Sequence, residues 1–304
     1  MINSTQVSYF TLSAYFDVGL FRYLYFMIIL SLYILIISSN VLLIVVISVN
    51  RSLHEPMNMF LCSLFVNELY GSSGLFPFLL IQILSDLHTV SAPLCFLQIF
   101  CVYTYVSVEI FNLAVMSYDR YLAICYPLLY NTLMTSEKVA MLIALTWFLP
   151  FLAIVVLIAL SASLKLCGNI IDRVYCGNYS IVKLSCSDIS VNNIYGLVYT
   201  FISFIGPLIL ILYTYTKILI ICFSGSKQTR QKALRTCTPH LASILNFWFG
   251  CSFQILQSRF DSSRVPALLG IFLSLYFLTC QPLFNPVLYG LKMNKIRDAC
   301  KRLL

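Results

Sequence analysis

The chain has 304 residues, of which 60% are hydrophobic and only 10% are charged, and its formal net charge is +8. Soluble domains carry about 25% charged residues, so this composition excludes an ordinary globular protein and indicates lipid as the surrounding medium. The positive charges lie in short segments between apolar runs, which excludes a continuous basic surface for nucleic acid.

Long segments with no charged residue, or with a single acid, predict the membrane-spanning elements. A bilayer core of roughly 30 Å needs about 20 residues of helix. Continuous apolar runs such as 27–37 favour helices over the alternating strands of a barrel. We expect helices near residues 23–50, 57–84, 92–118, 139–164, 193–223, 239–258 and 265–291.

The end of the chain has a different pattern. Ile296, Ala299, Cys300 and Leu303 recur at helical spacing with basic residues between them, which predicts an amphipathic helix over 293–304 lying on the membrane. The expected fold is therefore an all-α membrane protein: a seven-transmembrane helix bundle that forms one domain over 1–304, with a short amphipathic C-terminal helix.

Lysine and arginine are unequally distributed between the two sides of this bundle. Of the 19 such residues, six fall on one side, at Arg22, Lys165, Arg173, Lys183, Arg259 and Arg264, and the other thirteen on the opposite side. The richer side faces the cytoplasm, so we expect a multi-pass plasma-membrane protein with its amino terminus outside and its carboxyl terminus inside. Two glycosylation sequons, at Asn3 and Asn178, fall on the predicted outer side.

Four of the 12 cysteines also lie on the outer side, at Cys95, Cys167, Cys176 and Cys186. That compartment is oxidising, so disulfides are expected there. Four cysteines allow three pairings, and the sequence alone does not choose among them. A bridge from Cys95 would hold the long loop between the fourth and fifth helices over the mouth of the bundle.

An acid and a base stand side by side at the cytoplasmic end of the third helix, as Asp119 and Arg120, followed by Tyr121. The two side chains can pair with each other, and a conformational change can release the arginine. An interfacial ion pair that only marks the end of the helix is the alternative interpretation.

The string Met-Ser-Tyr-Asp-Arg-Tyr-Leu-Ala-Ile-Cys at 116–125 resembles the signature of odorant receptors, a branch of the rhodopsin-like (class A) G-protein-coupled receptors. Further matches follow the family's order: Leu-His-Glu-Pro-Met at 53–57, the segments 232–241 and 282–289, and Phe249-Gly250. The resemblance covers residues 40 to 297, and the run at 68–71 is similar to fish-type members. Pro239 is expected in the first turn of the sixth helix, which then lacks an interior proline.

The resemblance implies an odorant receptor, not an enzyme, with a small organic odorant and a heterotrimeric G protein of the stimulatory olfactory type as partners. It implies the disulfides Cys95–Cys176 and Cys167–Cys186. The residues expected to couple activation to the G protein are Asp119, Arg120, Tyr121, Tyr215, His240, Asn285, Pro286 and Tyr289. The odorant is expected in the outer part of the bundle, against Val102, Tyr103, Val106, Tyr199, Ser203, Ser252, Phe253, Leu256, Leu275 and Thr279.

Two acids are expected inside the bilayer, Glu68 and Glu109, and a buried carboxylate there indicates a function. In the wider receptor class these positions, with Asn40 and Asn285, line a sodium pocket; a sodium ion is the one cofactor expected. Packing by protonated acids is the alternative. Two other functions stay open: a receptor of the same fold for a non-odorant ligand, and a transporter built around Glu68 and Glu109.

Overall fold

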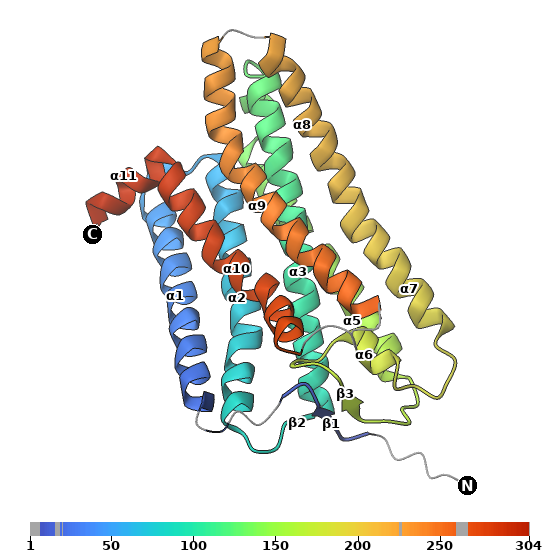
Figure 1. Ribbon diagram of the computed structural model, residues 1–304. Helices are drawn as coiled ribbons and strands as arrows, with labels where there is room; N and C mark the ends of the chain where they lie inside the picture. The colour runs from blue at the N-terminus through green and yellow to red at the C-terminus, as the bar shows by residue number, and fades with distance from the viewer. Residues whose placement is uncertain (1–6, 16–18, 20, 225–226, 260–266, 304) are drawn as a thin grey trace.

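The computed structural model describes residues 7–15, 19, 21–224, 227–259 and 267–303. Long helices dominate these ranges and pack side by side (Figure 1). They are α1 (Phe21–Val49), α2 (Pro56–Leu84), α3 (Ala92–Cys125), α5 (Ser136–Ala162), the continuous α7 (Ser190–Thr200), η2 (Phe201–Ile205) and α8 (Gly206–Ser224), α9 (Lys227–Arg259) and α10 (Ala267–Lys292). With α7, η2 and α8 taken as one, these are the seven predicted helices.

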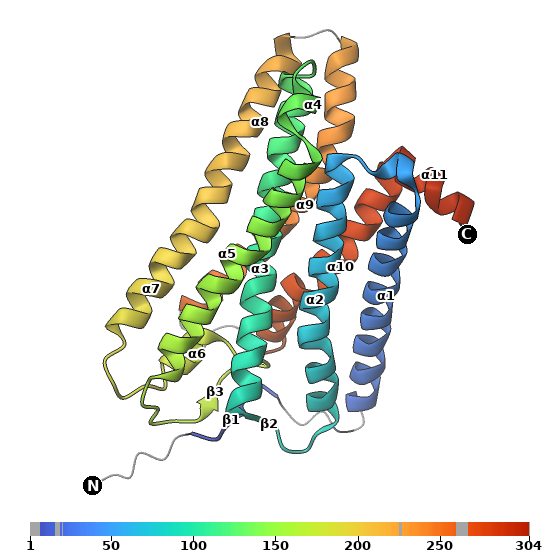
Figure 2. The ribbon, with the colours of Figure 1, turned by 180° about the vertical axis from the view of Figure 1, so that it is seen from behind.

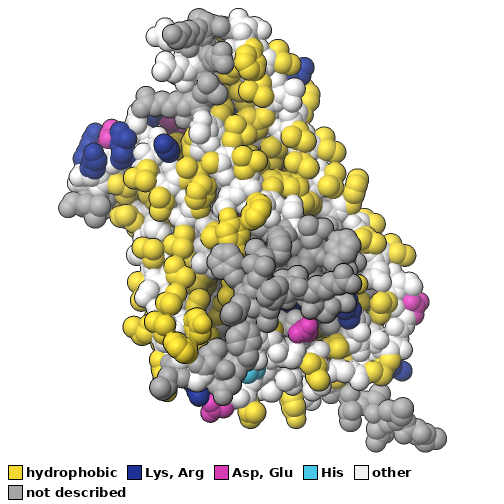
Figure 3. Space-filling view, in the orientation of Figure 1, with side chains coloured by type: hydrophobic (Ala, Val, Ile, Leu, Met, Phe, Trp, Pro, Cys, Tyr) yellow, Lys and Arg dark blue, Asp and Glu magenta, His cyan; other side chains and the backbone are white. Residues whose placement is uncertain are grey.

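Within the described ranges, five of these helices are long and apolar enough to cross a membrane: α1, α2, α3, α5 and the run Ser190–Ser224. Their hydrophobic side chains cover the flank of the molecule (Figure 3). Large apolar residues of α5 and α8, such as Phe148, Leu152 and Ile209, are more than half exposed. Asn40, Glu68, Glu109 and Asn285 are fully buried instead. Apolar residues outside and polar residues inside suit a bundle surrounded by lipid.

A small sheet closes one end of the bundle, and it was not predicted. Strand β1 (Tyr9–Leu12) lies between β2 (Thr89–Ser91), to which it is antiparallel, and β3 (Ile170–Ile171), to which it is parallel. Phe10 and Leu12 of β1 are buried at 0% and 1% exposure. The segment before α1 is therefore part of the packed structure at this end.

The opposite end carries the short helices η1 (Arg51–Leu53) and α4 (Tyr130–Leu133), and α11 (Asn294–Leu303) leaves the bundle sideways there (Figures 1 and 2). Lysine and arginine side chains gather around α11 (Figure 3). Ile296 is fully buried, whereas Lys295 pairs with Glu55 at the surface. An amphipathic helix across the bundle end is what the spacing of the tail predicts.

Two helix boundaries differ from the prediction. Helix α3 continues to Cys125, so Asp119 and Arg120 lie within its last two turns. Helix α9 begins at Lys227, and Pro239 is an interior residue and does not lie in the first turn. Segment 227–238 is rich in Lys, Arg and Gln, which form helix readily outside lipid. A search for uncharged runs finds only the part of a helix inside the membrane.

The fifth predicted helix contains a local change of winding. Residues Phe201–Ile205 form a π-helical segment between α7 and α8. Pro207 follows it and has no N–H to donate to the carbonyl four residues earlier, at Ser203. A π-helical segment accommodates such a break and is frequent at functional sites. It lies beside the cavity described below.

A close approach between α2 and α3 depends on Gly71. A Cβ at this position would overlap with Cδ2 and Cγ of the buried Tyr105 ring. We expect Gly71→Ala to lower the stability of the purified protein by about 1–3 kcal/mol, because the ring has no space to retreat. Gly206→Ala is the matched control, since nothing lies within 4 Å of its Cβ. Equal thermal unfolding temperatures for the two variants would contradict this packing.

Candidate functional site

A cavity of about 260 Å³ opens near the sheet end of the bundle. Its walls come from α3, the tip of α5, the start of the α7–η2 run, Cys251 of α9 and the loop between α5 and α7, here called the outer loop (residues 163–189). The described lining residues are Val102, Tyr103, Val106, Ser107, Leu157, Arg173, Tyr175, Gly177, Asn178, Tyr179, Ser180, Val182, Asn192, Asn193, Gly196, Tyr199, Thr200, Ser203, Phe204 and Cys251. Cavities of this kind, concave and mixed in polarity, hold small molecules.

Hydrogen bonds fix the wall between α3 and the α7–η2 run. The hydroxyls of Ser107 and Tyr199 lie 2.6 Å apart, and Ser203 donates to the Tyr199 carbonyl at 2.8 Å. The Phe204 ring packs on Trp248 of α9, with centroids 4.0 Å apart. Side chains at the cavity thus join α3, the α7–η2 run and α9.

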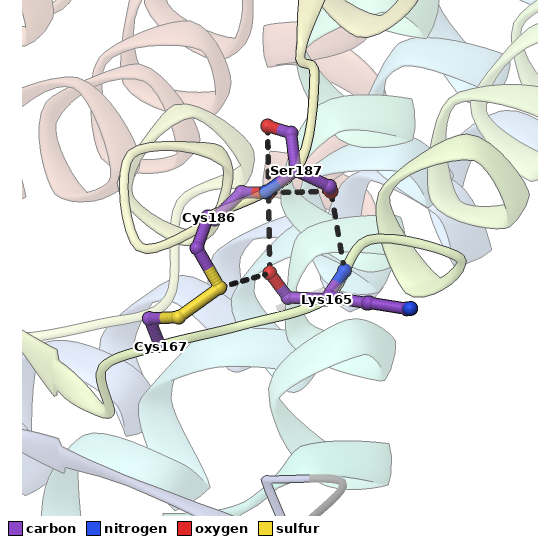
Figure 4. The surroundings of a disulfide bond; sticks show 5 residues. Lys165, Cys167, Cys186 and Ser187 are labelled. Atoms are coloured by element: carbon purple, nitrogen blue, oxygen red, sulfur yellow. Dashed lines mark hydrogen bonds between the residues drawn. A yellow bond between two sulfur atoms is a disulfide. The ribbon is translucent and has the colours of Figure 1, made fainter. Parts of the chain in front are cut away.

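Two disulfides hold the outer loop. Cys95 at the start of α3 is joined to Cys176, and both are fully buried, with Cα atoms 5.5 Å apart. The second bridge joins Cys167 to Cys186, and the Cys186 N–H donates to the Lys165 carbonyl at 3.0 Å (Figure 4). Both pairings implied by the resemblance are present. The outer loop is thus fixed over the cavity.

Five of the ten residues expected to bind ligand line this cavity: Val102, Tyr103, Val106, Tyr199 and Ser203. Ser252 is exposed and does not, because it follows the lining residue Cys251 by about 100° around the helix. Leu275 and Thr279 are half-buried on α10, which contributes no described lining residue. The side chains of Phe253 and Leu256 lie outside the described residues.

The largest group of lining residues that the sequence did not predict comes from the outer loop, including Arg173, Tyr175 and Tyr179. The sequence features that could have indicated a role for this loop in the cavity were its length and its three cysteines. Asn178, expected to carry a glycan, is also a lining residue. Its side chain is only 8% exposed, and its Oδ1 accepts a hydrogen bond from Ser161 at 2.7 Å. This placement disfavours a glycan at Asn178. Asn3 lies outside the described residues.

Below the cavity, a buried polar network joins α2, α3 and α10. Asn285 Nδ2 donates to Glu68 Oε1 at 2.6 Å and to Glu109 Oε1 at 3.1 Å. Asn67 Nδ2 donates to Glu109 Oε2 at 2.9 Å, and Ser243 of α9 donates to Asn285 Oδ1 at 2.7 Å. Glu68 Oε2 is buried without a hydrogen-bond partner. The two carboxyl groups therefore share the amide of Asn285, which agrees with the similar depth predicted for Glu68 and Glu109.

Asn40 does not donate to these carboxyl groups. Its Nδ2 donates to the carbonyls of Ile36 at 2.9 Å and Pro282 at 3.0 Å. Pro286 stands four residues after Pro282 and has no N–H for that carbonyl. Asn40 supplies the missing donor, so its amide nitrogen stabilises the break in α10.

At the opposite end of the bundle, Arg120 is held by its neighbour. Its Nε donates to Asp119 Oδ2 at 3.0 Å, and Tyr130 of α4 donates to Asp119 Oδ1 at 2.6 Å. The Asp119 side chain is fully buried, and that of Arg120 is 17% exposed. Burial and the Asp119 carboxylate raise the pKa of the Tyr130 hydroxyl, so it stays protonated as a donor. Both oxygens of Asp119 are thus occupied.

The remaining residues expected at the activation switch lie on four helices. The Tyr215 hydroxyl of α8 lies 2.6 Å from Nδ1 of the buried His240 of α9. Tyr289 is buried, and its ring meets Phe65 edge to face. Tyr121 of α3 packs against Tyr126, with centroids 5.6 Å apart. The first contact joins α8 to α9, the second joins α10 to α2, and the third lies at the end of α3.

The comparisons with known proteins agree along the whole chain. The family model described as "Olfactory receptor" matches residues 29–304. The human Olfactory receptor 11A1 is 33% identical over 301 residues, covering 98% of this chain and 94% of the relative. The chain belongs to the olfactory receptor family. The mouse Olfactory receptor 5P68 is 34% identical over 304 residues, covering 99% of this olfactory receptor and 95% of the relative.

The crystal structure of squid rhodopsin shows the same fold, with a TM-score of 0.77, 18% sequence identity and coverage of 95% of this chain and 87% of that chain. The predicted seven-helix bundle is therefore confirmed. The family and the fold together establish a multi-pass membrane receptor and not an enzyme.

Proposed function

We propose that this olfactory receptor binds a small organic odorant in the cavity under the outer loop and activates a heterotrimeric G protein, of the stimulatory olfactory type, at the end that carries Arg120. The observation that supports this proposal most directly is the cavity. Its volume of about 260 Å³ suits a small molecule rather than a peptide. Its walls combine apolar side chains with a few hydroxyl and amide groups, which is the usual composition of small-molecule sites.

The cavity and Arg120 lie toward opposite ends of α3, and the route between them supports coupling. Ser107 lines the cavity, and Glu109 follows two residues later in the buried network with Asn285 of α10. Ser243 and Gln281 extend that network to α9, which also carries His240. A ligand that prefers one arrangement of these helices shifts the population toward it. The proposed outcome is release of Arg120 toward the G protein.

The test is an odorant panel on cells expressing the receptor, with an amino-terminal tag outside and a carboxyl-terminal tag inside as the expected topology. At least one odorant should raise cAMP in a concentration-dependent manner, and the response should disappear in cells without the stimulatory G protein. Uptake of the odorant or a current in those same cells would support a transporter. A response restricted to non-odorant metabolites would support a receptor for another ligand class.

We also propose a bound monovalent cation, sodium, between Glu68 and Glu109. The unpartnered buried oxygen Glu68 Oε2 fits such an ion. In the described residues no third acid, cysteine or histidine lies with Glu68 and Glu109, so the site has few ligands for a divalent metal. Sodium chloride, compared with choline chloride, should raise the thermal unfolding temperature of the purified receptor by a few degrees, and Glu68→Gln should abolish the difference. An equal effect of sodium on wild type and variant would exclude this site.

A further inference from the structure

Two asparagines of the cavity wall are bonded to one hydroxyl. Ser161 of α5 donates to Asn178 Oδ1 of the outer loop at 2.7 Å, and it accepts from Asn192 Nδ2 of α7 at 3.2 Å. Asn178 and Asn192 both line the cavity, and they are only 8% and 6% exposed. A serine hydroxyl has one proton to donate, so one amide turns its oxygen toward Ser161 and the other turns its nitrogen. The halves left over are therefore one amide nitrogen and one carbonyl oxygen.

These two halves, Asn178 Nδ2 and Asn192 Oδ1, have no hydrogen-bond partner among the described residues. A buried amide atom without a partner costs free energy, and a ligand with the matching group removes that cost. The hydroxyls elsewhere on the wall are bonded already: Ser107 and Tyr199 to each other at 2.6 Å, and Ser203 to the Tyr199 carbonyl at 2.8 Å. The asparagine pair therefore needs the polar group of a ligand more than these hydroxyls do.

The backbone on both sides of the pair is held in place. Two residues before Asn178, the disulfide between the outer loop and α3 fixes the chain. Three residues after Asn192, the Tyr195 hydroxyl of α7 donates to the Ala153 carbonyl of α5 at 2.8 Å. The donor and the acceptor are thus in position before a ligand arrives. Groups fixed in this way bind a ligand with little loss of conformational entropy.

We infer that the preferred ligands of this cavity are small uncharged carboxamides and lactams, in which one group carries both a carbonyl oxygen and an N–H. The carbonyl accepts from Asn178 Nδ2 and the N–H donates to Asn192 Oδ1, while the apolar remainder packs against side chains such as Val106 and Phe204. The inference rests on the proposed function, because it names the ligand class of the same cavity.

The pair of asparagines disfavours related compounds for a stated reason each. An ester has the carbonyl but no N–H, a carboxylate offers only acceptors, and an ammonium group offers only donors. A site built to form a hydrogen bond with its ligand rejects analogues that lack the matching group, because its own buried polar atom is then left unpaired. Each of these compounds leaves at least one of Asn178 Nδ2 and Asn192 Oδ1 in that state.

The experiment compares matched compounds on the full-length receptor. The probes are straight-chain primary amides from butanamide to octanamide and 3-phenylpropanamide, each with its methyl ester, carboxylic acid and amine. Binding is read from the thermal unfolding temperature of receptor in nanodiscs, and signalling from cAMP in cells. We expect amides to act at concentrations at least about tenfold lower than the corresponding esters, acids and amines.

Two variants distinguish the roles of the asparagines. Asn192→Ala should raise the half-maximal concentration of the amides by at least about tenfold and leave that of the esters unchanged, since an ester has no N–H for Asn192. Asn178→Ala should weaken amides and esters alike, because both use their carbonyl. Asn169→Ala is the matched control: it removes an asparagine side chain of the outer loop that is not among the described lining residues. Amides and esters are compared within each variant, so the amount of folded receptor does not affect the ratio.

A glycan on Asn178 would occupy the nitrogen that the inference assigns to the ligand. Asn3→Gln removes the other sequon expected on the outer side. Treatment of this variant with a peptide N-glycosidase should therefore leave its mobility on a gel unchanged. A shift would show a glycan on Asn178 and overturn the inference.

The outcomes separate this inference from the proposed function. Esters, acids or amines that act at lower concentrations than amides, or amides that act equally on wild type and both alanine variants, overturn the ligand class and leave the receptor function intact. Amides that bind in an Asn192-dependent manner without a cAMP response support the ligand class and contradict the G-protein coupling. A panel in which no amide binds overturns the inference, whatever other odorants do.

Discussion

Arg120→Ala should abolish the odorant-evoked cAMP response while the receptor still reaches the cell surface. In the structure the Arg120 guanidinium is held by Asp119, whose other oxygen accepts from Tyr130. In the proposed mechanism, Arg120 is the positive group that a change in helix packing releases toward the G protein. Alanine removes the charge that the G protein would meet, so we expect the maximal response to fall at least about tenfold. Surface level is measured by flow cytometry on an amino-terminal tag.

A substitution at Asp119 should change cAMP in the opposite direction and serves as a control. Asp119→Asn weakens the hold on Arg120 and should raise basal cAMP, because a change of about 1.4 kcal/mol shifts a two-state population tenfold. Tyr130→Phe removes one hydrogen bond to the same carboxylate and should act in the same direction, more weakly. Arg120→Ala receptors that signal like wild type at equal surface level would remove Arg120 from the coupling mechanism.

Cys95→Ser should nearly eliminate receptor from the cell surface. The bridge to Cys176 closes a separation of 81 residues, and both cysteines are fully buried between α3 and the outer loop. Loss of such a disulfide costs about 2–5 kcal/mol, a large part of the stability of a protein. It also leaves a polar serine hydroxyl in a buried site. Surface level and the resistance of the solubilised receptor to heat are the measurements.

The second disulfide supplies the comparison. Cys167 and Cys186 are exposed and only 19 residues apart, so the loop that they close is shorter. Cys167→Ser should therefore reduce the surface level less than Cys95→Ser does. The reverse order, or equal levels, would show that the outer loop does not depend on its anchor to α3.

The helices follow from the sequence because lipid imposes a simple rule. Uncharged runs of about 20 residues must form helices there. The rule stops at the membrane surface, which is why it missed the extension of α9 before Pro239. It also cannot find β1, β2 and β3, which are four, three and two residues long and pair across the sequence. Pairing of such short strands depends on the fold that surrounds them.

Some features of the candidate site could likewise be predicted from the sequence, and others could not. The depth of Glu68 and Glu109 along their helices follows from residue counting, and the structure joins both to Asn285. Asn40 lies at a suitable depth too, yet its amide nitrogen serves the carbonyl that Pro286 leaves without a donor. The partners of Asn40 depend on how its helix is rotated about its axis and on which acceptors compete for its amide. The spacing of residues along the sequence indicates neither. Arg173 joins the cavity through loop geometry that no periodicity describes.

The position of β1 at the centre of its sheet has a consequence for biosynthesis. Strand β1 pairs with residues 170–171, so the ribosome must add about 160 residues after β1 before that pairing can form. At roughly 5–20 residues per second this delay lasts about 8–30 s. During that interval Phe10 and Leu12, which are buried in the complete fold, lack the cover that β3 and its loop provide. The nascent receptor therefore presents a strand with an unpaired edge, which favours aggregation if synthesis stalls.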